Sequence, residues 1–151
     1  MAFDKKAYAR EYQQRPEVKA KKKAYRQRPE VKARNNKNKK AWINSSPYNF
    51  VRHKVWHQKT SAKRRGIDWE LDVEATIAKI LRQGRCKLSG EKFVYKQGKG
   101  KRNLYAPSID RIDSRKGYVP GNIMFVCWAV NGMKQDLSLY QFKKMCARVA
   151  A

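Results

Sequence analysis

The sequence predicts an α+β protein, in which helices surround a small strand–loop–strand–helix unit and a basic helical arm precedes it. Three observations support this fold class: a proline-containing repeat near the start, helix caps in the middle and at the end, and two short apolar strands joined by a polar loop. A chain of 151 residues can form one compact domain with an appendage. We place the arm over residues 1–45 and the domain over residues 46–151.

The charge of the chain predicts a polyanionic partner. Lysine and arginine total 37 and aspartate and glutamate total 12, which gives a formal net charge of +25. The first 66 residues hold 21 of the basic residues and 4 of the acidic ones. Nucleic acid suits such a segment, because basic side chains displace its condensed counterions. A membrane surface suits it less, since an interfacial helix needs a broad apolar face that residues 1–40 lack.

Hydropathy and cysteine usage indicate a soluble, intracellular protein that does not bind membranes. No apolar run approaches the roughly 18 residues that a membrane-spanning helix requires. The three cysteines are an odd number at wide spacing, so they form no disulfide framework of the secreted kind. We therefore expect reduced thiols.

The arm contains an internal repeat of seven residues: Gln14–Ala20 recurs as Gln27–Ala33, thirteen residues later. Proline suits the first turn of a helix and a glutamate beside it favours the helix N-terminus, so each repeat starts a new helix. The expected helices are Asp4–Gln14, Pro16–Arg26 and Pro29 to about Lys40. Helices this short and this basic are marginal in water, so we expect the free arm to be partly disordered and to order on DNA.

Four further elements follow in the domain. Ser46 and Pro47 start a basic helix that continues to Arg65, and residues 67–71 alternate like a short strand. Asp72 caps a helix that runs to Gln83 and ends at a glycine. Ser138 and Gln141 form a capping box for a last helix, which we expect to pack through one apolar face made of Phe142, Met145, Cys146 and Val149.

The segment between these helices carries the candidate chemistry. A strand containing Asp110 leads into a tight polar loop, and an apolar strand, Ile123–Cys127, then leads into a short helix, Trp128–Lys134. An aspartate on the first strand and Asn131 on the helix can meet at one small site. Their oxygens are the ligands that Mg²⁺ prefers, while retained waters leave room for a substrate phosphate.

These residues resemble a known family. The stretches Ser108–Asp113, Lys116–Asn122 and Val126–Lys134 are similar to the ββα-metal core of HNH (His-Me finger) endonucleases, above all those encoded by phages. The segments 62–68 and 84–90 resemble the lead-in of such proteins. The resemblance implies an α+β fold with a ββα-metal core at about residues 104–135, and a location in the cytoplasm of a bacterial or phage-infected cell.

The resemblance also implies roles for individual residues. Asp110 and Asn131 match the two metal ligands, for Mg²⁺ or Mn²⁺, and Asn122 matches the loop residue that orients the general base. Arg111 stands where the family places the histidine that activates water. Arginine stays protonated and is no conventional base, but it suits binding of the scissile phosphate. Three replacements stay open: Asp113, on the same strand face; loss of the proton from a metal-bound water; or one of the histidines of the upstream helix, His53 and His57.

Zinc is not expected, although many HNH domains hold a structural zinc ion with two cysteine pairs. The corresponding pairs here read Cys86 with Ser89 and Cys127 with Val130. Zinc sites need four good ligands and valine is none. Both thiols are therefore expected to be small buried packing groups.

The function expected from these patterns is metal-dependent hydrolysis of double-stranded DNA by a monomer or weak dimer, with a nick as the product of one site. A noncatalytic DNA-binding protein on a degenerate HNH scaffold is the main alternative, because Arg111 replaces the base. An RNA-binding or ribosome-associated protein is favoured by charge alone. The residues expected to contact DNA are Arg15, Lys19, Arg28, Lys32, Lys63, Arg64, Arg65, Lys99, Lys101, Arg102 and Lys134.

Overall fold

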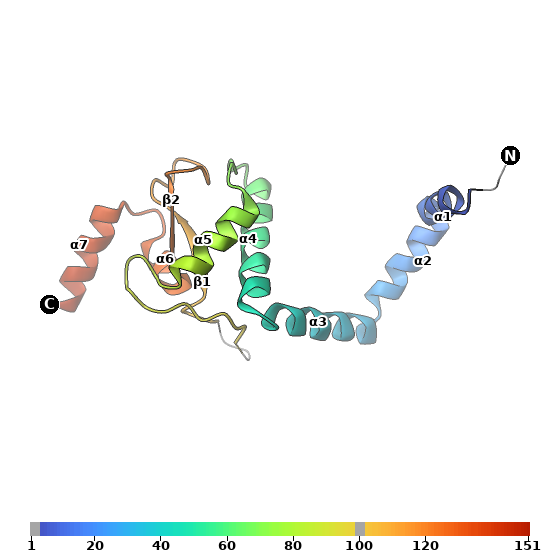
Figure 1. Ribbon diagram of the computed structural model, residues 1–151, viewed down its shortest axis with the longest axis horizontal. Helices are drawn as coiled ribbons and strands as arrows, with labels where there is room; N and C mark the ends of the chain where they lie inside the picture. Colours follow the sequence, from blue (N-terminus) through green and yellow to red (C-terminus); the bar gives the residue numbers. More distant parts are fainter. Residues whose placement is uncertain (1–3, 99–101) are drawn as a thin grey trace. The chain divides into compact units, whose positions relative to one another are not determined.

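Figure 1 shows the computed structural model of the chain, which describes residues 4–98 and 102–151. The chain divides into two compact units, Met1–Ala41 and Trp42–Ala151. The predicted DNA contacts Lys99 and Lys101 lie outside the described residues. Among the described residues, no helix has the length and apolar character needed to cross a membrane.

The first unit is helical, as the repeat predicts. It contains α1 (Lys5–Gln14), α2 (Pro16–Gln27) and the first part of α3 (Pro29–Asn44), which extends beyond the predicted end. Asp4 caps α1 through its carboxylate, which accepts hydrogen bonds from two backbone amides. Each repeat begins its helix at proline, directly after an arginine with extended backbone angles.

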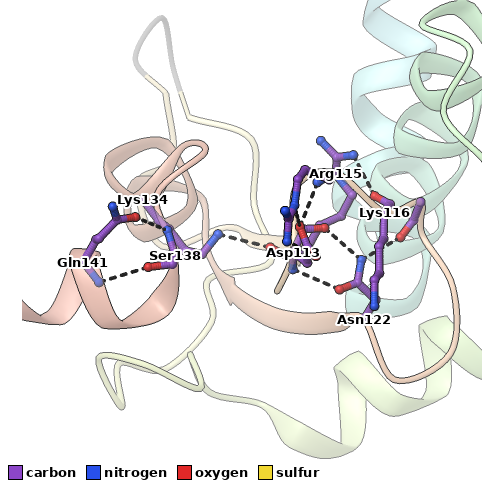
Figure 2. Close-up of polar contacts among 9 residues, drawn as sticks. Asp113, Arg115, Lys116, Asn122, Lys134, Ser138 and Gln141 are labelled. Atoms are coloured by element: carbon purple, nitrogen blue, oxygen red, sulfur yellow. Dashed lines mark hydrogen bonds and ion pairs between the residues drawn. The ribbon is translucent and has the colours of Figure 1, made fainter.

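Three helices of the second unit follow the predicted caps. The side chain of Ser46 caps α4 (Pro47–Arg64), and that of Asp72 caps α5 (Val73–Gln83). Gly84 ends α5 with a positive φ of 62°, a conformation that favours glycine. The capping box of Ser138 and Gln141 starts α7 (Leu139–Ala150), and Figure 2 shows its two reciprocal hydrogen bonds.

The strands and the helix between α5 and α7 form a strand–strand–helix unit. β1 (Pro107–Arg111) pairs antiparallel with β2 (Ile123–Cys127), and α6 (Trp128–Lys134) begins at the next residue. Asp110 lies opposite Met124 in this register. The predicted bounds of β2 and α6 are confirmed. Asp113, expected on the same strand as Arg111, instead lies beyond the end of β1, in the loop.

The core of the second unit lies where α4 and α5 contact the sheet. Its buried members include Val51, Val55, Ile77, Ile80, Ile109 and Val126. Cys86 and Cys127 are buried in the same core, and burial with the nearby Cys86 raises the pKa of the Cys127 thiol to about 11. Within residues 4–98 and 102–151, no group of three or more histidine, cysteine or acidic side chains is arranged to hold a metal ion.

Two predicted features are wrong. Residues 67–71 form no strand, because Trp69 makes a single isolated bridge to Tyr118. The predicted apolar face of α7 is also largely solvent-exposed: Phe142 is buried, whereas Met145 is 51% exposed and Val149 is 83% exposed. The helix period placed these side chains on one face correctly, but the period does not tell which residues another element covers.

Candidate active site

A cleft of about 210 Å³ opens at the strand–strand–helix unit. Asp110 and Arg111 reach it from β1, Asn131 from α6, and Tyr118 from the loop between the strands. The predicted metal ligands, Asp110 and Asn131, therefore share one cleft although 21 residues separate them in sequence.

Asp110 is a buried carboxylate with 5% of its surface exposed. Its Oδ2 lies 3.1 Å from Nζ of Lys134, an ion pair by distance whose angles do not meet those of a hydrogen bond. Among the described residues, this oxygen has no hydrogen-bond partner. Burial raises the pKa of Asp110 above its ordinary value, and the charge of Lys134 offsets part of that rise.

Lys134 is held inside the protein. Its side chain is 1% exposed, and its Nζ donates a hydrogen bond to the backbone oxygen of Arg111 at 3.1 Å. The prediction that Lys134 contacts DNA is therefore wrong, because a buried ammonium cannot reach a phosphate of the duplex. The sequence gives little warning of this burial, since a lysine at a helix end is ordinarily solvent-exposed.

Asn131 turns its amide nitrogen towards β1. The Nδ2 atom donates to Oγ of Ser108 at 2.7 Å and to the backbone oxygen of Ile109 at 3.4 Å. Because the nitrogen makes both contacts with the strand, the amide oxygen is the atom that remains to bind a ligand in the cleft. This orientation agrees with the role of a neutral oxygen donor.

Asn122 braces the loop between the strands, as Figure 2 shows. Its Oδ1 accepts from the backbone amide of Asp113 at 2.9 Å, and its Nδ2 donates to the backbone oxygens of Asp113 and Gly117. The side chain thus fixes both ends of the loop. Its predicted role in orienting a general base stays a prediction, since these contacts are all with backbone atoms.

Asp113 forms a two-toothed contact with Arg115, also drawn in Figure 2. The guanidinium lies 3.1 Å from each carboxylate oxygen, through Nε and Nη2. These hydrogen bonds hold the pKa of Asp113 below its ordinary value. A carboxylate stabilised in its charged form is a weak proton acceptor, which disfavours Asp113 as the base.

Arg111 is held by its own loop. Its Nη1 donates to the backbone oxygen of Lys116 at 2.9 Å, and its guanidinium carbon lies 5.5 Å from the ring centroid of Tyr118. A guanidinium oriented in this way keeps further N–H groups for an anion in the cleft.

The two histidines lie on α4, with ring centroids 6.3 Å apart. His57 lines a second cavity, of about 360 Å³, which Ser108 and Asn131 also line. The two cavities therefore meet at Asn131. This places His57, rather than Asp113, beside the candidate metal ligands.

The arm presents basic side chains in a regular pattern. Arg15, Lys19, Arg28 and Lys32 are exposed, whereas Val18 and Val31, at equivalent repeat positions, are buried. Each repeat arginine also lies over a tyrosine three residues earlier, at 5.5 Å for Arg15 over Tyr12 and 5.6 Å for Arg28 over Tyr25. Sequence reasoning missed these stacks, although both tyrosines hold the same place in the repeat.

One helix of the arm carries a continuous basic stripe. The side chains of Lys19, Lys22, Lys23 and Arg26 line one shallow depression on α2. Their spacing of three and four residues places them on one face of the helix. Within the described part of the chain, ion pairs join only Arg115 with Asp113 and Lys134 with Asp110, so these four cations remain available to a polyanion.

The other predicted DNA contacts belong to the second unit. Lys63, Arg64 and Arg65 are exposed around the end of α4. Arg102 is exposed and its guanidinium carbon lies 5.1 Å from the ring centroid of Trp128. Their predicted role in binding DNA is compatible with this exposure and stays a prediction.

Comparison with known proteins places the fold. No protein-family model matches the chain. Over 89 residues the chain is 34% identical to an uncharacterised 29.0 kDa protein from the dda–modA intergenic region of Enterobacteria phage T4, a match that covers 59% of this chain and 34% of the phage protein. The chain therefore spans about a third of the length of that relative.

A solved structure is similar to the chain as well. The rare-cutting HNH restriction endonuclease PacI aligns with 63% of this chain and 73% of its own, with a TM-score of 0.51 and 18% sequence identity. At this identity the similarity concerns the fold. The protein thus has an α+β fold, with a small two-stranded antiparallel sheet, similar to that of an HNH endonuclease.

Proposed function

We propose that this protein is a metal-dependent DNA endonuclease of the HNH type, with Asp110 and Asn131 as its metal ligands. The observation that carries the proposal is the Oδ2 atom of Asp110. It is buried and has no hydrogen-bond partner in the described structure, and it faces the cleft that Asn131 shares. Buried polar atoms are normally satisfied, so an orphaned carboxylate oxygen supports an absent ligand.

The residues fit Mg²⁺ or Mn²⁺. Asp110 offers carboxylate oxygens and Asn131 offers an amide oxygen, and hard cations bind such donors while keeping several waters. One or two protein ligands are typical for Mg²⁺ at a phosphate site. When bound, the ion would neutralise phosphate charge and stabilise the leaving oxygen.

Arg111 and His57 are the residues that we assign to the substrate and to the proton. Arg111, oriented by Lys116 and Tyr118, binds the scissile phosphate and the charge that develops on it. A water oxygen attacks the phosphorus, its proton passes to His57, and the bridging phosphorus–oxygen bond breaks. The support for His57 is its position in the cavity that Asn131 borders.

The arm is assigned to affinity. Its exposed basic stripe on α2 and its repeated arginines contact phosphates of double-stranded DNA, which positions the duplex without reading its sequence. A monomer with one cleft would release nicked DNA. We keep the domain division at residue 45 as part of this proposal.

A second function is favoured by one observation. Arg111 occupies the position of the expected base and is fixed by the loop around it. A noncatalytic DNA-binding protein on a degenerate HNH scaffold would show this feature as well. Cleavage assays distinguish the two.

The first test uses supercoiled plasmid in Mg²⁺, in Mn²⁺ and in EDTA. We expect metal-dependent conversion to open circles by the wild type, and a loss of at least about 100-fold for Asp110→Ala, because a metal-stabilised transition state is worth several kcal/mol. Affinity for duplex in EDTA should be unchanged or improved by the substitution. Absence of cutting by both proteins, with equal retardation of DNA on a gel, would favour the noncatalytic function.

The second test removes residues 1–40. The truncated protein should bind duplex DNA more weakly and with a smaller dependence of affinity on salt, because fewer counterions are released. Binding titrations at several salt concentrations measure both quantities. An unchanged salt dependence would contradict the role of the arm.

A further inference from the structure

We propose that Arg65 joins Arg111 as a second phosphate-binding arginine of the cleft, and that Tyr118 positions both. The inference rests on the proposed function for its substrate, a phosphodiester of DNA. It goes beyond that function by assigning a specific task to the segment after α4, whose resemblance to phage proteins the metal site alone leaves unexplained.

Tyr118 is the meeting point of the two arginines. Its phenol oxygen accepts a hydrogen bond from Nη2 of Arg65 at 3.4 Å and another from the side chain of Gln58, while its ring lies beneath the guanidinium of Arg111. The tyrosine is 4% exposed and therefore rigidly placed. Both arginines line the cleft of about 210 Å³ that contains Asp110 and Asn131.

The backbone explains how two distant segments reach one cleft. Tyr118 donates its amide to the backbone oxygen of Asp68 at 2.8 Å, and its own carbonyl accepts from the amide of Glu70 at 3.0 Å. Gly117 allows this approach, since a Cβ atom there would lie 2.7 Å from the oxygen of Asp68. The turn after α4, and Arg65 with it, is thus fastened to the loop between the strands.

The charges around Tyr118 favour an anion between the arginines. Asp110 and Asp136 also line the cleft, but in the described part of the chain neither forms an ion pair with Arg65 or Arg111. Two guanidinium groups held on one neutral phenol repel each other until an anion is shared. Arginine pairs bind phosphate oxygens with well-directed hydrogen bonds, so a phosphate is the anion that this geometry fits.

This arrangement makes Arg65 act on the rate and not only on affinity. An exposed arginine elsewhere contributes one of many phosphate contacts to binding. An arginine preorganised beside the reacting phosphate also stabilises the charge of the transition state, which a ground-state contact does not do.

The test compares Arg65→Gln with Arg82→Gln. Both substitutions remove one positive charge, but Arg82 is exposed on α5, away from the cleft. With enzyme in excess over plasmid, we expect Arg65→Gln to lower the single-turnover nicking rate at least about tenfold, while affinity for duplex in EDTA falls by less than about threefold. Arg82→Gln should retain the wild-type rate. Equal rates for the two variants would overturn the proposal.

Tyr118→Phe tests the positioning role. It keeps the ring beneath Arg111 and removes only the phenol oxygen that Arg65 and Gln58 contact. The rate should fall severalfold in the wild-type background and hardly at all in Arg65→Gln, because both changes disturb the same contact. Independent, additive effects would contradict the role. Should Tyr118→Phe fail to fold, Arg65→Lys takes its place, since it keeps the charge and loses the directed fork.

A titration with inorganic phosphate separates this inference from the proposed function. The side-chain Nε–H signals of Arg65 and Arg111 are followed by nuclear magnetic resonance, with that of Arg82 as reference. Joint movement of the first two signals with one dissociation constant supports the clamp even if the protein cuts no DNA. Movement of Arg111 alone would overturn it.

Discussion

Lysines serve opposite purposes in the two units of this protein. In the arm, the lysines of α2 are exposed on one stripe and form no ion pair within the described part of the chain. In the second unit, Lys134 is 1% exposed and is held by Asp110 and by the backbone of β1. The comparison teaches that the arm depends on the number of its charges, whereas the site depends on where each charge lies.

The largest effect is expected at Lys134. Lys134→Met leaves the carboxylate of Asp110 buried without a cation, which should lower the free energy of unfolding by about 3 kcal/mol. Urea denaturation measures the change, with Lys143→Met at an exposed position as control. The double variant Lys134→Met with Asp110→Asn should recover part of the loss, because no buried charge remains. Equal effects of the Lys134 and Lys143 substitutions would remove the contrast between the units.

A smaller effect is expected on the arm. Replacing Lys19, Lys22 and Lys23 together by glutamine should reduce the slope of log affinity against log salt by about 3, because three phosphate contacts are lost. The matched control is the same charge change in α7, at Lys143, Lys144 and Arg148, all of which are exposed. Fluorescence anisotropy with a labelled duplex provides both slopes. If the two triple variants behave alike, charge on any surface suffices and the stripe has no special role.

The smallest effect concerns Asp113. Its pKa lies below the ordinary value of 3.8 because of the hydrogen bonds from Arg115. A depressed pKa stabilises the folded state above the ordinary pKa, and this contribution is lost as the pH falls through the folded-state value. Asp113→Asn should therefore be slightly less stable than the wild type near neutral pH and equal to it in strong acid. Urea midpoints between pH 2 and 7, with Glu91→Gln as the surface-charge control, test the sign.

The arm and the helix caps could be predicted from sequence because local rules govern them. Proline after arginine begins α2 and α3, and Ser46, Asp72 and Ser138 each cap the helix that follows. The bounds of β2 and α6 followed in the same way from an apolar run next to a helical segment.

The details of the site could not be predicted in this way, because tertiary contacts decide them. Nothing local distinguishes Lys134, which is buried, from the exposed lysines around it. The contact of Arg65 with Tyr118 joins residues 53 positions apart and depends on the approach of Gly117 to Asp68. The exposure of Val149 likewise shows that an apolar stripe needs a partner to become a core.

The repeat has a consequence for how such a protein can change over generations. Arg15 and Arg28 adopt nearly the same backbone angles, φ −57° with ψ 136° and φ −58° with ψ 134°, so every thirteen-residue unit joins the next in the same way. An in-frame duplication or loss of one unit in the gene would lengthen or shorten the arm by one helix without altering the fold that follows. The reach of the protein along its partner could thus be inherited as a copy number, adjusted in whole steps, while the cleft stays as it is.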